Sequence, residues 1–358
     1  MPTLFDPISL GAIDCPNRIL MAPLTRGRAD ARSVPNDLMR DYYVQRASAG
    51  LIISEATGVS SEGLGWPFAP GLWTDAQTEA WKPITDAVHK AGGRIIAQLW
   101  HMGRIVHSSY NDGRVGVSSS ATRAPGQAYT YAGKQDYEEA RALQLGEIPR
   151  LIGDYVAAAE NAKRAGFDGV QIHSANGYLL DQFLRDNANF RDDEYGGSIE
   201  NRIRLTTEVT RAVCDVWGAG HVSVRLAPNG DSQGVNDSNP EPLFCAAAAA
   251  LDALGIGFLE LREPDENGTF GSTDVPRLSP AIRKVFKGNL VTNSDRTPEE
   301  AEAELGAGID AVSFGRLFMA NPDLPRRFSE GLALNPLLGA KTWYSPGAEG
   351  YTDYPFAA

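Results

Sequence analysis

Three side chains that can hold an oxygen atom or donate a proton lie close together in the sequence, at His173, Asn176 and Tyr178. They follow residues 169–172, a short apolar run of the kind that forms a buried strand. Barrel enzymes carry their chemistry at the C-terminal ends of their strands. There a His/Asn pair can bind a carbonyl oxygen or an oxyanion, and a tyrosine beside it can donate a proton. The spacing therefore predicts an enzyme that polarises a carbonyl group and protonates a carbon.

Polar side chains also mark the ends of two other predicted strands. Gln98 lies in the apolar run 94–99 and is either a satisfied core amide or an amide that reads the donor and acceptor edges of a planar ring. Trp100 follows it and could form a pocket wall. Arg225 lies in the run 222–226, where a guanidinium is costly unless it is paired. A solvated strand end is the alternative, but we expect Arg225 to face a ligand and stabilise negative charge.

Residues near the first, second and eighth predicted strands could bind a flat, phosphorylated ligand. Gly315 and Arg316 lie where barrels often bind phosphate, and arginine supplies charge-assisted hydrogen bonds there. Thr25 offers a rim hydroxyl, although most such threonines cap a turn. Ala56 would let a ring lie against the backbone, or is simple packing. Aromatic residues expected at the same rim suit a partly apolar pocket, with ordinary packing as the alternative: Trp66, Phe68, Trp100, Phe270 and Tyr344.

Alternating strand and helix patterns predict how these residues are positioned. The predicted strands, each read as apolar on both faces, are 19–23, 51–54, 94–99, 169–172, 222–226, 258–261, 290–292 and 311–314. Helical patterns, most of them ending at glycine, cover 75–90, 148–165, 199–217, 241–254 and 298–305. Such repeats predict an α/β fold of the (β/α)8 TIM-barrel class, with residues 1–358 as one domain. We expect a β-hairpin at 4–15 and a capping excursion over the C-terminal rim at 101–147.

Composition excludes several other classes of protein. The net charge is −12 and no run of Lys or Arg occurs, which argues against nucleic acid as a partner. The three cysteines are far apart, which argues against a zinc ribbon or an iron–sulfur cluster and favours a reducing cytoplasm. The start of the chain lacks the pattern of a signal peptide, and the longest apolar run, 243–251, is too short to cross a membrane. We therefore expect a cytoplasmic protein, as a monomer or a weak homodimer.

Several longer motifs resemble one known family, and the likeness runs from Leu4 to Pro355. The motifs are Ala22-Pro23-Leu24-Thr25-Arg26, Gln98-Leu99-Trp100-His101-x-Gly103-Arg104, His173-x-x-Asn176-x-Tyr178, Asp181-Gln182-Phe183-Leu184-Arg185-Asp186-Asn187, Asp193-x-Tyr195-Gly196-Gly197-Ser198-x-Glu200-Asn201-Arg202, Phe314-Gly315-Arg316 and the tail 347–355. They resemble the Old Yellow Enzyme family of flavin-dependent ene-reductases. Within that family the chain resembles the bacterial N-ethylmaleimide and pentaerythritol tetranitrate reductases.

The resemblance implies one non-covalent FMN at the mouth of the barrel, reduced by NADPH or NADH, with activated alkenes as substrates. Kinetics would be ping-pong. His173 and Asn176 would bind the carbonyl, nitro or imide oxygen, and Tyr178 would protonate the α-carbon. The residues implied to hold FMN are Pro23, Leu24, Thr25, Ala56, Gln98, Arg225, Asn293, Ser294, Asp295, Gly315 and Arg316. The implied substrate pocket consists of Phe68, Trp100, Phe270 and Tyr344.

Some residues depart from the family's pattern. Many relatives have glycine in the loop after the seventh strand, whereas residues 292–295 have none, and Asp295 would disfavour phosphate unless its side chain turns away. Phe68 stands where some relatives carry tyrosine, which bears on the range of substrates. Two other functions stay open from the residues alone. One is a metal-dependent lyase or hydrolase using His101 and His173, although the usual ligand spacing is missing. The other is a barrel that binds flavin without turnover.

Overall fold

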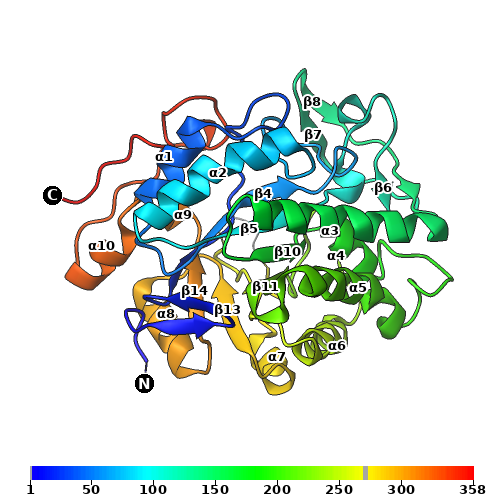
Figure 1. Cartoon of the computed structure of the whole chain (residues 1–358). Helices are drawn as coiled ribbons and strands as arrows, with labels where there is room; N and C mark the ends of the chain where they lie inside the picture. The colour runs from blue at the N-terminus through cyan, green and yellow to red at the C-terminus, as the bar shows by residue number, and fades with distance from the viewer. Residues whose placement is uncertain (1, 269–272) are drawn as a thin grey trace.

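The computed structural model describes residues 2–268 and 273–358. Within them, eight parallel strands close into a barrel in the order β10-β11-β12-β13-β14-β3-β4-β5 (Figure 1). The strands are β3 (Ile19–Met21), β4 (Ile52–Gly58), β5 (Ile95–Trp100), β10 (Val170–Ser174), β11 (Val222–Leu226), β12 (Phe258–Arg262), β13 (Asn289–Asn293) and β14 (Ala311–Phe314). Each overlaps one predicted strand, which confirms the (β/α)8 architecture.

Helices surround this barrel on the outside (Figure 1). They are α1 (Asp37–Gln45), α2 (Asp75–Lys90), α3 (Ile148–Arg164), α4 (Leu179–Leu184), α5 (Ile199–Trp217), α6 (Pro240–Ala253), α7 (Ser279–Val285), α8 (Pro298–Gly306), α9 (Arg316–Ala320) and α10 (Leu324–Glu330). The predicted helices correspond to α2, α3, α5, α6 and α8. The sequence patterns did not reveal α1, α4, α7, α9 and α10, which have five to nine residues and show little periodicity. Helix α8 also has nine residues, but Pro298 at its start and Gly306 at its end marked it.

The interior of the barrel is apolar at one end and polar at the other. The hairpin β1 (Ile8–Leu10) and β2 (Ile13–Cys15), predicted at 4–15, closes the N-terminal end. Its apolar side chains pack there against strand residues such as Phe258 and Val291. Towards the other end the inward positions are Gln98, Gln171, Glu260 and Ser313, all buried. The expectation of strands that are apolar on both faces is therefore wrong for the C-terminal half of the barrel, where polar side chains form hydrogen bonds with one another.

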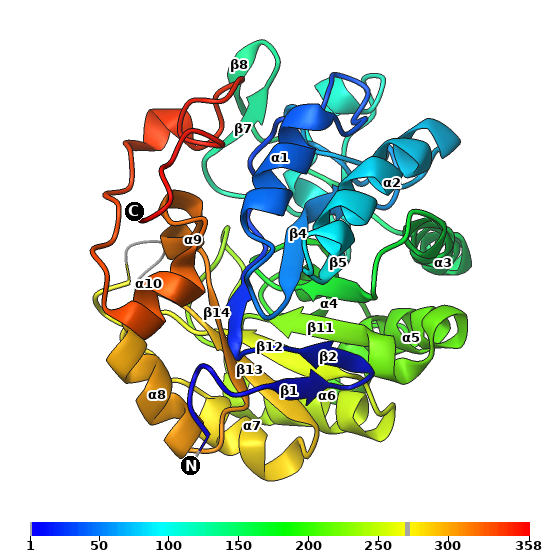
Figure 2. The same cartoon turned by 60° about the vertical axis from the view of Figure 1, so that its left-hand side comes forward.

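The segment 101–147 adds small elements at the mouth of the barrel. They are the strand pair β6 (Val117–Ser118) and β9 (Arg141–Ala142), and the hairpin β7 (Gln127–Thr130) and β8 (Gly133–Asp136). The hairpin lies beside the C-terminal segment in Figure 2. Trp66 contacts both, because its ring centroid is 5.1 Å from that of Tyr129 and 5.2 Å from that of Tyr344. Three distant parts of the chain thus meet above the mouth.

Two arginines after β3 hold the C-terminal segment in place. Arg26 Nη2 donates to the carbonyl of Gly350 at 2.7 Å, and Arg28 Nη1 donates to the carbonyl of Trp343 at 2.6 Å. The ring of Tyr351 stacks on that of Tyr42 in α1 at 4.0 Å, and the Arg28 guanidinium lies 4.6 Å from the Tyr351 ring centre. We call these four contacts the C-terminal clasp.

Among the described helices, none has the length and apolar character needed to span a membrane.

Candidate active site

Parallel pairing brings most of the predicted site residues to one end of the barrel. Gln98 is in register with Ala56 on one side and Gln171 on the other. His173 is in register with Arg225. Because parallel strands all end at the same rim, these side chains face a common mouth.

The aromatic rings at this mouth pack around Tyr178. Its ring centroid is 4.9 Å from that of Trp100 and 5.1 Å from that of His173, both in edge-to-face arrangements. Trp100 and His173 themselves lie 6.5 Å apart at an interplanar angle of 25°. Such aromatic pairs stabilise the positions of the rings beyond what burial alone gives. The phenol of Tyr178 is therefore held beside the imidazole of His173.

A strained turn carries Asn176 and Tyr178 out of β10. Asn176 has φ +59° and Gly177 has φ +77°, both in the left-handed region. A Cβ at Gly177 would lie 2.4 Å from the carbonyl oxygen of Ser232, so only glycine fits there. Asp181 Oδ2 accepts a hydrogen bond from the Gly177 amide at 2.9 Å, and Gln182 Nε2 donates to the Gly177 carbonyl at 2.8 Å. This explains the Asp-Gln pair that follows in the sequence, because its side chains hold the turn.

Burial controls the protonation of the two titratable groups. It lowers the pKa of His173 well below its ordinary value, and the charges of Arg225 and Arg262 act in the same direction. The imidazole is therefore neutral at neutral pH and donates through one ring N–H. Burial also raises the pKa of Tyr178 above its usual range, partly offset by a hydrogen bond from the side chain of Gln233. The phenol keeps its proton and can donate it to a partner.

Several buried polar atoms at the mouth fit a polar, planar group such as FMN. In the described parts of the chain, Trp100 Nε1, His173 Nδ1 and Asn176 Oδ1 are buried and have no hydrogen-bond partner. A buried polar atom without a partner costs free energy, so such atoms are usually satisfied by a ligand or by water. The Gln98 amide on β5 and the Arg225 guanidinium on β11 lie on the two strands that flank β10 at the same mouth. The donors and acceptors present there suit the edge of a flavin ring.

The predicted phosphate site lies at the ends of β13 and β14. Arg316 begins α9 and forms an ion pair with Asp295, so the Asp295 carboxylate turns towards this arginine. Asn293 is buried and accepts a hydrogen bond from Arg225 at 2.7 Å. A Cβ at Gly315 would lie 3.3 Å from Leu24 Cδ2, so the segment after β3 closes on the segment after β14. Ser294 and Thr25 lie at this rim, partly buried.

The remaining predicted pocket residues lie further out on the rim. Phe68 makes an edge-to-face contact with Tyr131 of the capping segment, at 5.1 Å between ring centroids. Tyr344 is 41% exposed and meets Trp66. Pro23 and Leu24, which are expected to hold FMN, follow β3 after Ala22. Phe270 lies outside the described residues.

The sequence patterns missed Arg262, Glu260 and Gln233. Arg262 ends β12 in register with Asn293 and is only 7% exposed. Burial and the nearby charge of Arg225 lower its pKa to about 10. The alternation Glu260-x-Arg262 in an apolar strand is a signal that could have been used, because inward-facing residues recur every second position. Gln233 follows β11 in a loop, where no spacing rule connects it with Tyr178.

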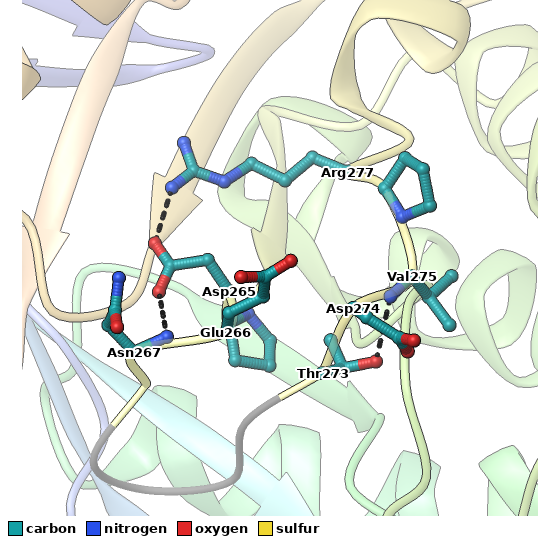
Figure 3. A pocket seen from close by; sticks show the side chains of 9 residues that line it. Asp265, Glu266, Asn267, Thr273, Asp274, Val275 and Arg277 are labelled. Carbon is teal, nitrogen blue, oxygen red and sulfur yellow. Dashed lines mark hydrogen bonds and ion pairs between the residues drawn. The ribbon is translucent and has the colours of Figure 1, made fainter.

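Two other features of the described residues do not form a competing site. No three His, Cys, Asp or Glu side chains come together there as a metal site would require. A hollow of about 370 Å³ lies beside the loop after β12, and some of the residues that line it are hydrogen-bonded to one another (Figure 3). In it Asp265 accepts from Arg277 at 2.9 Å, and Thr273 Oγ1 accepts from the Val275 amide at 3.1 Å.

Comparisons with known proteins agree with this geometry. A model of the NADH:flavin oxidoreductase / NADH oxidase family matches residues 3–335. The chain is 41% identical to putative 12-oxophytodienoate reductase 11 of Oryza sativa subsp. japonica, over 99% of this chain and 97% of that protein. It is 59% identical to the solved structure of the old yellow enzyme homologue from Zymomonas mobilis, with a TM-score of 0.97 and 99% of both chains covered. It is 44% identical to morphinone reductase in complex with tetrahydroNAD, with a TM-score of 0.94, covering 100% of this chain and 98% of that one.

Proposed function

The chain belongs to the Old Yellow Enzyme family of NADH:flavin oxidoreductases, and from that membership we propose that it reduces the C=C bond of activated alkenes. The family implies FMN as cofactor and a nicotinamide nucleotide as reductant. The proposed substrates are α,β-unsaturated carbonyl, nitro or imide compounds. The names of two relatives, a 12-oxophytodienoate reductase and a morphinone reductase, point to oxo compounds as what those proteins reduce.

The observation that carries this proposal is the placement of a protonated phenol beside a neutral imidazole at the barrel mouth. His173 and Asn176 would hold the substrate oxygen, which draws electron density away from the alkene. Tyr178, whose ring lies 5.1 Å from that of His173, would give its phenolic proton to the α-carbon. The resulting phenolate would then take a proton back from solvent. FMN, when bound, supplies the hydride for the β-carbon, having taken it from the nicotinamide.

The residues proposed to hold FMN are divided between its ring and its phosphate. Ala56, Gln98 and Arg225 would contact the ring, with Thr25 at its edge and Pro23 and Leu24 beneath the rim. The proposed phosphate ligands are Arg316 and the backbone amides of Asn293, Ser294, Asp295 and Gly315. We propose NADPH as the usual reductant. Because both reactants would use one mouth, turnover would be ping-pong.

An anaerobic visible spectrum of the purified protein tests the proposal directly. We expect a flavin band that bleaches on addition of NADPH and returns on addition of 2-cyclohexenone. A protein that shows no flavin band, even after incubation with FMN, would refute the proposal. If NADPH bleaches the band and oxygen restores it, but none of the tested alkenes does, only the alkene-reducing part of the proposal is refuted.

A further inference from the structure

A chain of buried polar side chains lies directly beneath the mouth and joins two residues that are proposed to contact FMN. Gln98 Nε2 donates to Gln171 Oε1 at 2.8 Å, and Gln171 Nε2 donates to Glu260 Oε2 at 2.9 Å. Glu260 Oε1 in turn lies 2.7 Å from Arg225 Nη1. None of the four is more than 4% exposed, so water does not replace these contacts. We call this chain the Glu260 relay.

The charge of Glu260 gives the relay a direction. A carboxylate only accepts hydrogen bonds, so the neighbouring Gln171 must turn its NH2 group towards Glu260. The carbonyl oxygen of Gln171 then faces Gln98, which must donate an N–H to it. Gln98 is left with its own carbonyl oxygen and its second N–H for a ligand. One buried charge thus selects which amide edge Gln98 offers at the mouth.

The same carboxylate also fixes Arg225. Besides the ion pair, Glu260 accepts a hydrogen bond from Ser313 Oγ. Arg225 Nη2 donates to Asn293 Oδ1 at 2.7 Å, and Asn293 Nδ2 donates to the Ser313 carbonyl at 2.8 Å. Glu260 and Asn293 therefore both hold the guanidinium, and the carboxylate of Glu260 partly compensates its positive charge. Buried ion pairs of this kind hold a geometry strongly, because removing one partner leaves the other charge uncompensated.

We infer that Glu260 is a positioning residue for the cofactor, acting through Gln171 on the amide of Gln98 and directly on the charge of Arg225. This inference rests on the proposed placement of FMN against Gln98 and Arg225. Arg225 would face the negative charge that FMN gains on reduction. Glu260 thereby limits how far Arg225 favours reduced over oxidised FMN.

The first test is Glu260→Gln, measured by the midpoint potential of bound FMN in a dye-equilibration titration. With the counter-charge removed, we expect the ratio of affinities for reduced over oxidised FMN to rise about tenfold, a positive shift of about 30 mV for a two-electron couple. The visible band should also shift, because the orientation of the Gln98 amide is no longer fixed. Ser223→Ala is the matched control, since Ser223 is a buried polar residue of β11 outside the relay.

The second test is the exchange Gln171→Glu with Glu260→Gln in one protein. This keeps one buried carboxylate and still presents an acceptor to Gln98, so the spectrum should return most of the way to wild type. The potential should return only in part, because the carboxylate no longer contacts Arg225 directly. It also tests the inference if Glu260→Gln alone does not fold. A ratio of affinities for reduced over oxidised FMN within twofold of wild type in Glu260→Gln would overturn the inference, and so would an exchange variant whose spectrum is no closer to wild type than that of the single variant.

A third variant separates this inference from the proposed function. Gln98→Leu should weaken FMN binding, measured by recovery of FMN fluorescence on dilution, if FMN lies where it is proposed. If Gln98→Leu leaves FMN affinity and spectrum unchanged, the proposed cofactor site is wrong and the relay falls with it. If Gln98→Leu weakens binding while Glu260→Gln changes nothing, the site stands and only the relay is overturned.

Discussion

At the scale of single residues, Tyr178 combines a position at the mouth with a pKa that burial raises. We expect Tyr178→Phe to slow reoxidation of reduced FMN by 2-cyclohexenone by about 10²–10⁴-fold, the range for loss of a general acid. Reduction of FMN by NADPH needs no proton from this phenol and should stay within about threefold of wild type. Anaerobic stopped-flow traces of the two half-reactions measure both rates, and equal losses in both would contradict the role.

The pair Arg316 and Asp295 gives a prediction of opposite signs. Arg316→Met should raise the Kd for FMN about tenfold or more, because a charge-assisted hydrogen bond to phosphate is lost. Asp295→Asn should lower the Kd severalfold, because it removes a carboxylate that pairs with the same guanidinium. Fluorescence titration at two salt concentrations measures both changes. Weaker binding by Asp295→Asn would mean that the aspartate orients Arg316 and does not compete with phosphate.

How much of the site can be read from sequence depends on whether a residue lies on a regular element. His173, Gln98 and Arg225 interrupt apolar strands, so their places at the rim follow from periodicity. Arg262 obeys the same rule and could have been found. Gln233 could not, because it reaches Tyr178 from a loop with a left-handed backbone, φ +53°, that no local pattern specifies.

At the scale of elements, the C-terminal clasp is the contact most open to test. Tyr351 is fully buried against Tyr42 and Arg28. We expect Tyr351→Ala to lower the free energy of unfolding by about 3–5 kcal/mol, as large aromatic truncations in cores do. Phe356→Ala, in the same segment but 53% exposed, should change it by no more than about 0.5 kcal/mol. Urea unfolding of the FMN-loaded proteins gives both values, and similar losses would show that the clasp adds nothing specific.

Helices and strands differ in how well the sequence predicts them. Helices α2 and α5 have the predicted bounds, because each has an N-cap side chain and an amphipathic pattern of at least sixteen residues. Helix α9 has five residues and its position depends on the end of β14, so tertiary contacts decide it. Likewise, the polar C-terminal half of the barrel follows from which strands are neighbours, which the order of strands along the chain does not show by itself.

At the scale of the whole molecule, one buried histidine sets part of the response to acid. Burial, with a smaller effect of Arg150, lowers the pKa of His101 to about 3, whereas an unfolded histidine has its ordinary value of 6.5. Between these values the unfolded chain binds a proton that the folded chain does not, so stability falls as pH falls from 6.5. The loss is about 1.4 kcal/mol per pH unit for one such group.

Urea unfolding at pH 7, 6 and 5 with saturating FMN measures this dependence. His101 Nδ1 accepts a hydrogen bond from the Gly103 amide at 3.1 Å. In His101→Asn the asparagine side chain can still accept this hydrogen bond, but it does not titrate. We expect the free energy of unfolding of His101→Asn to fall less steeply with decreasing pH than that of the wild type. The difference in slope should correspond to one bound proton. Parallel pH profiles would show that other groups control the response.

The hairpin closes the N-terminal end of the barrel, so the proposed reactants would reach the site through the opposite mouth. Its apolar side chains fill that end together with Phe258 and Val291. Under the proposed function, nucleotide, alkene and both products would pass through this mouth, and each would exclude the others while it is bound there. An excess of alkene would occupy the oxidised enzyme before the nucleotide arrives. Initial rates should therefore decline at high alkene concentration, and more nucleotide should restore them.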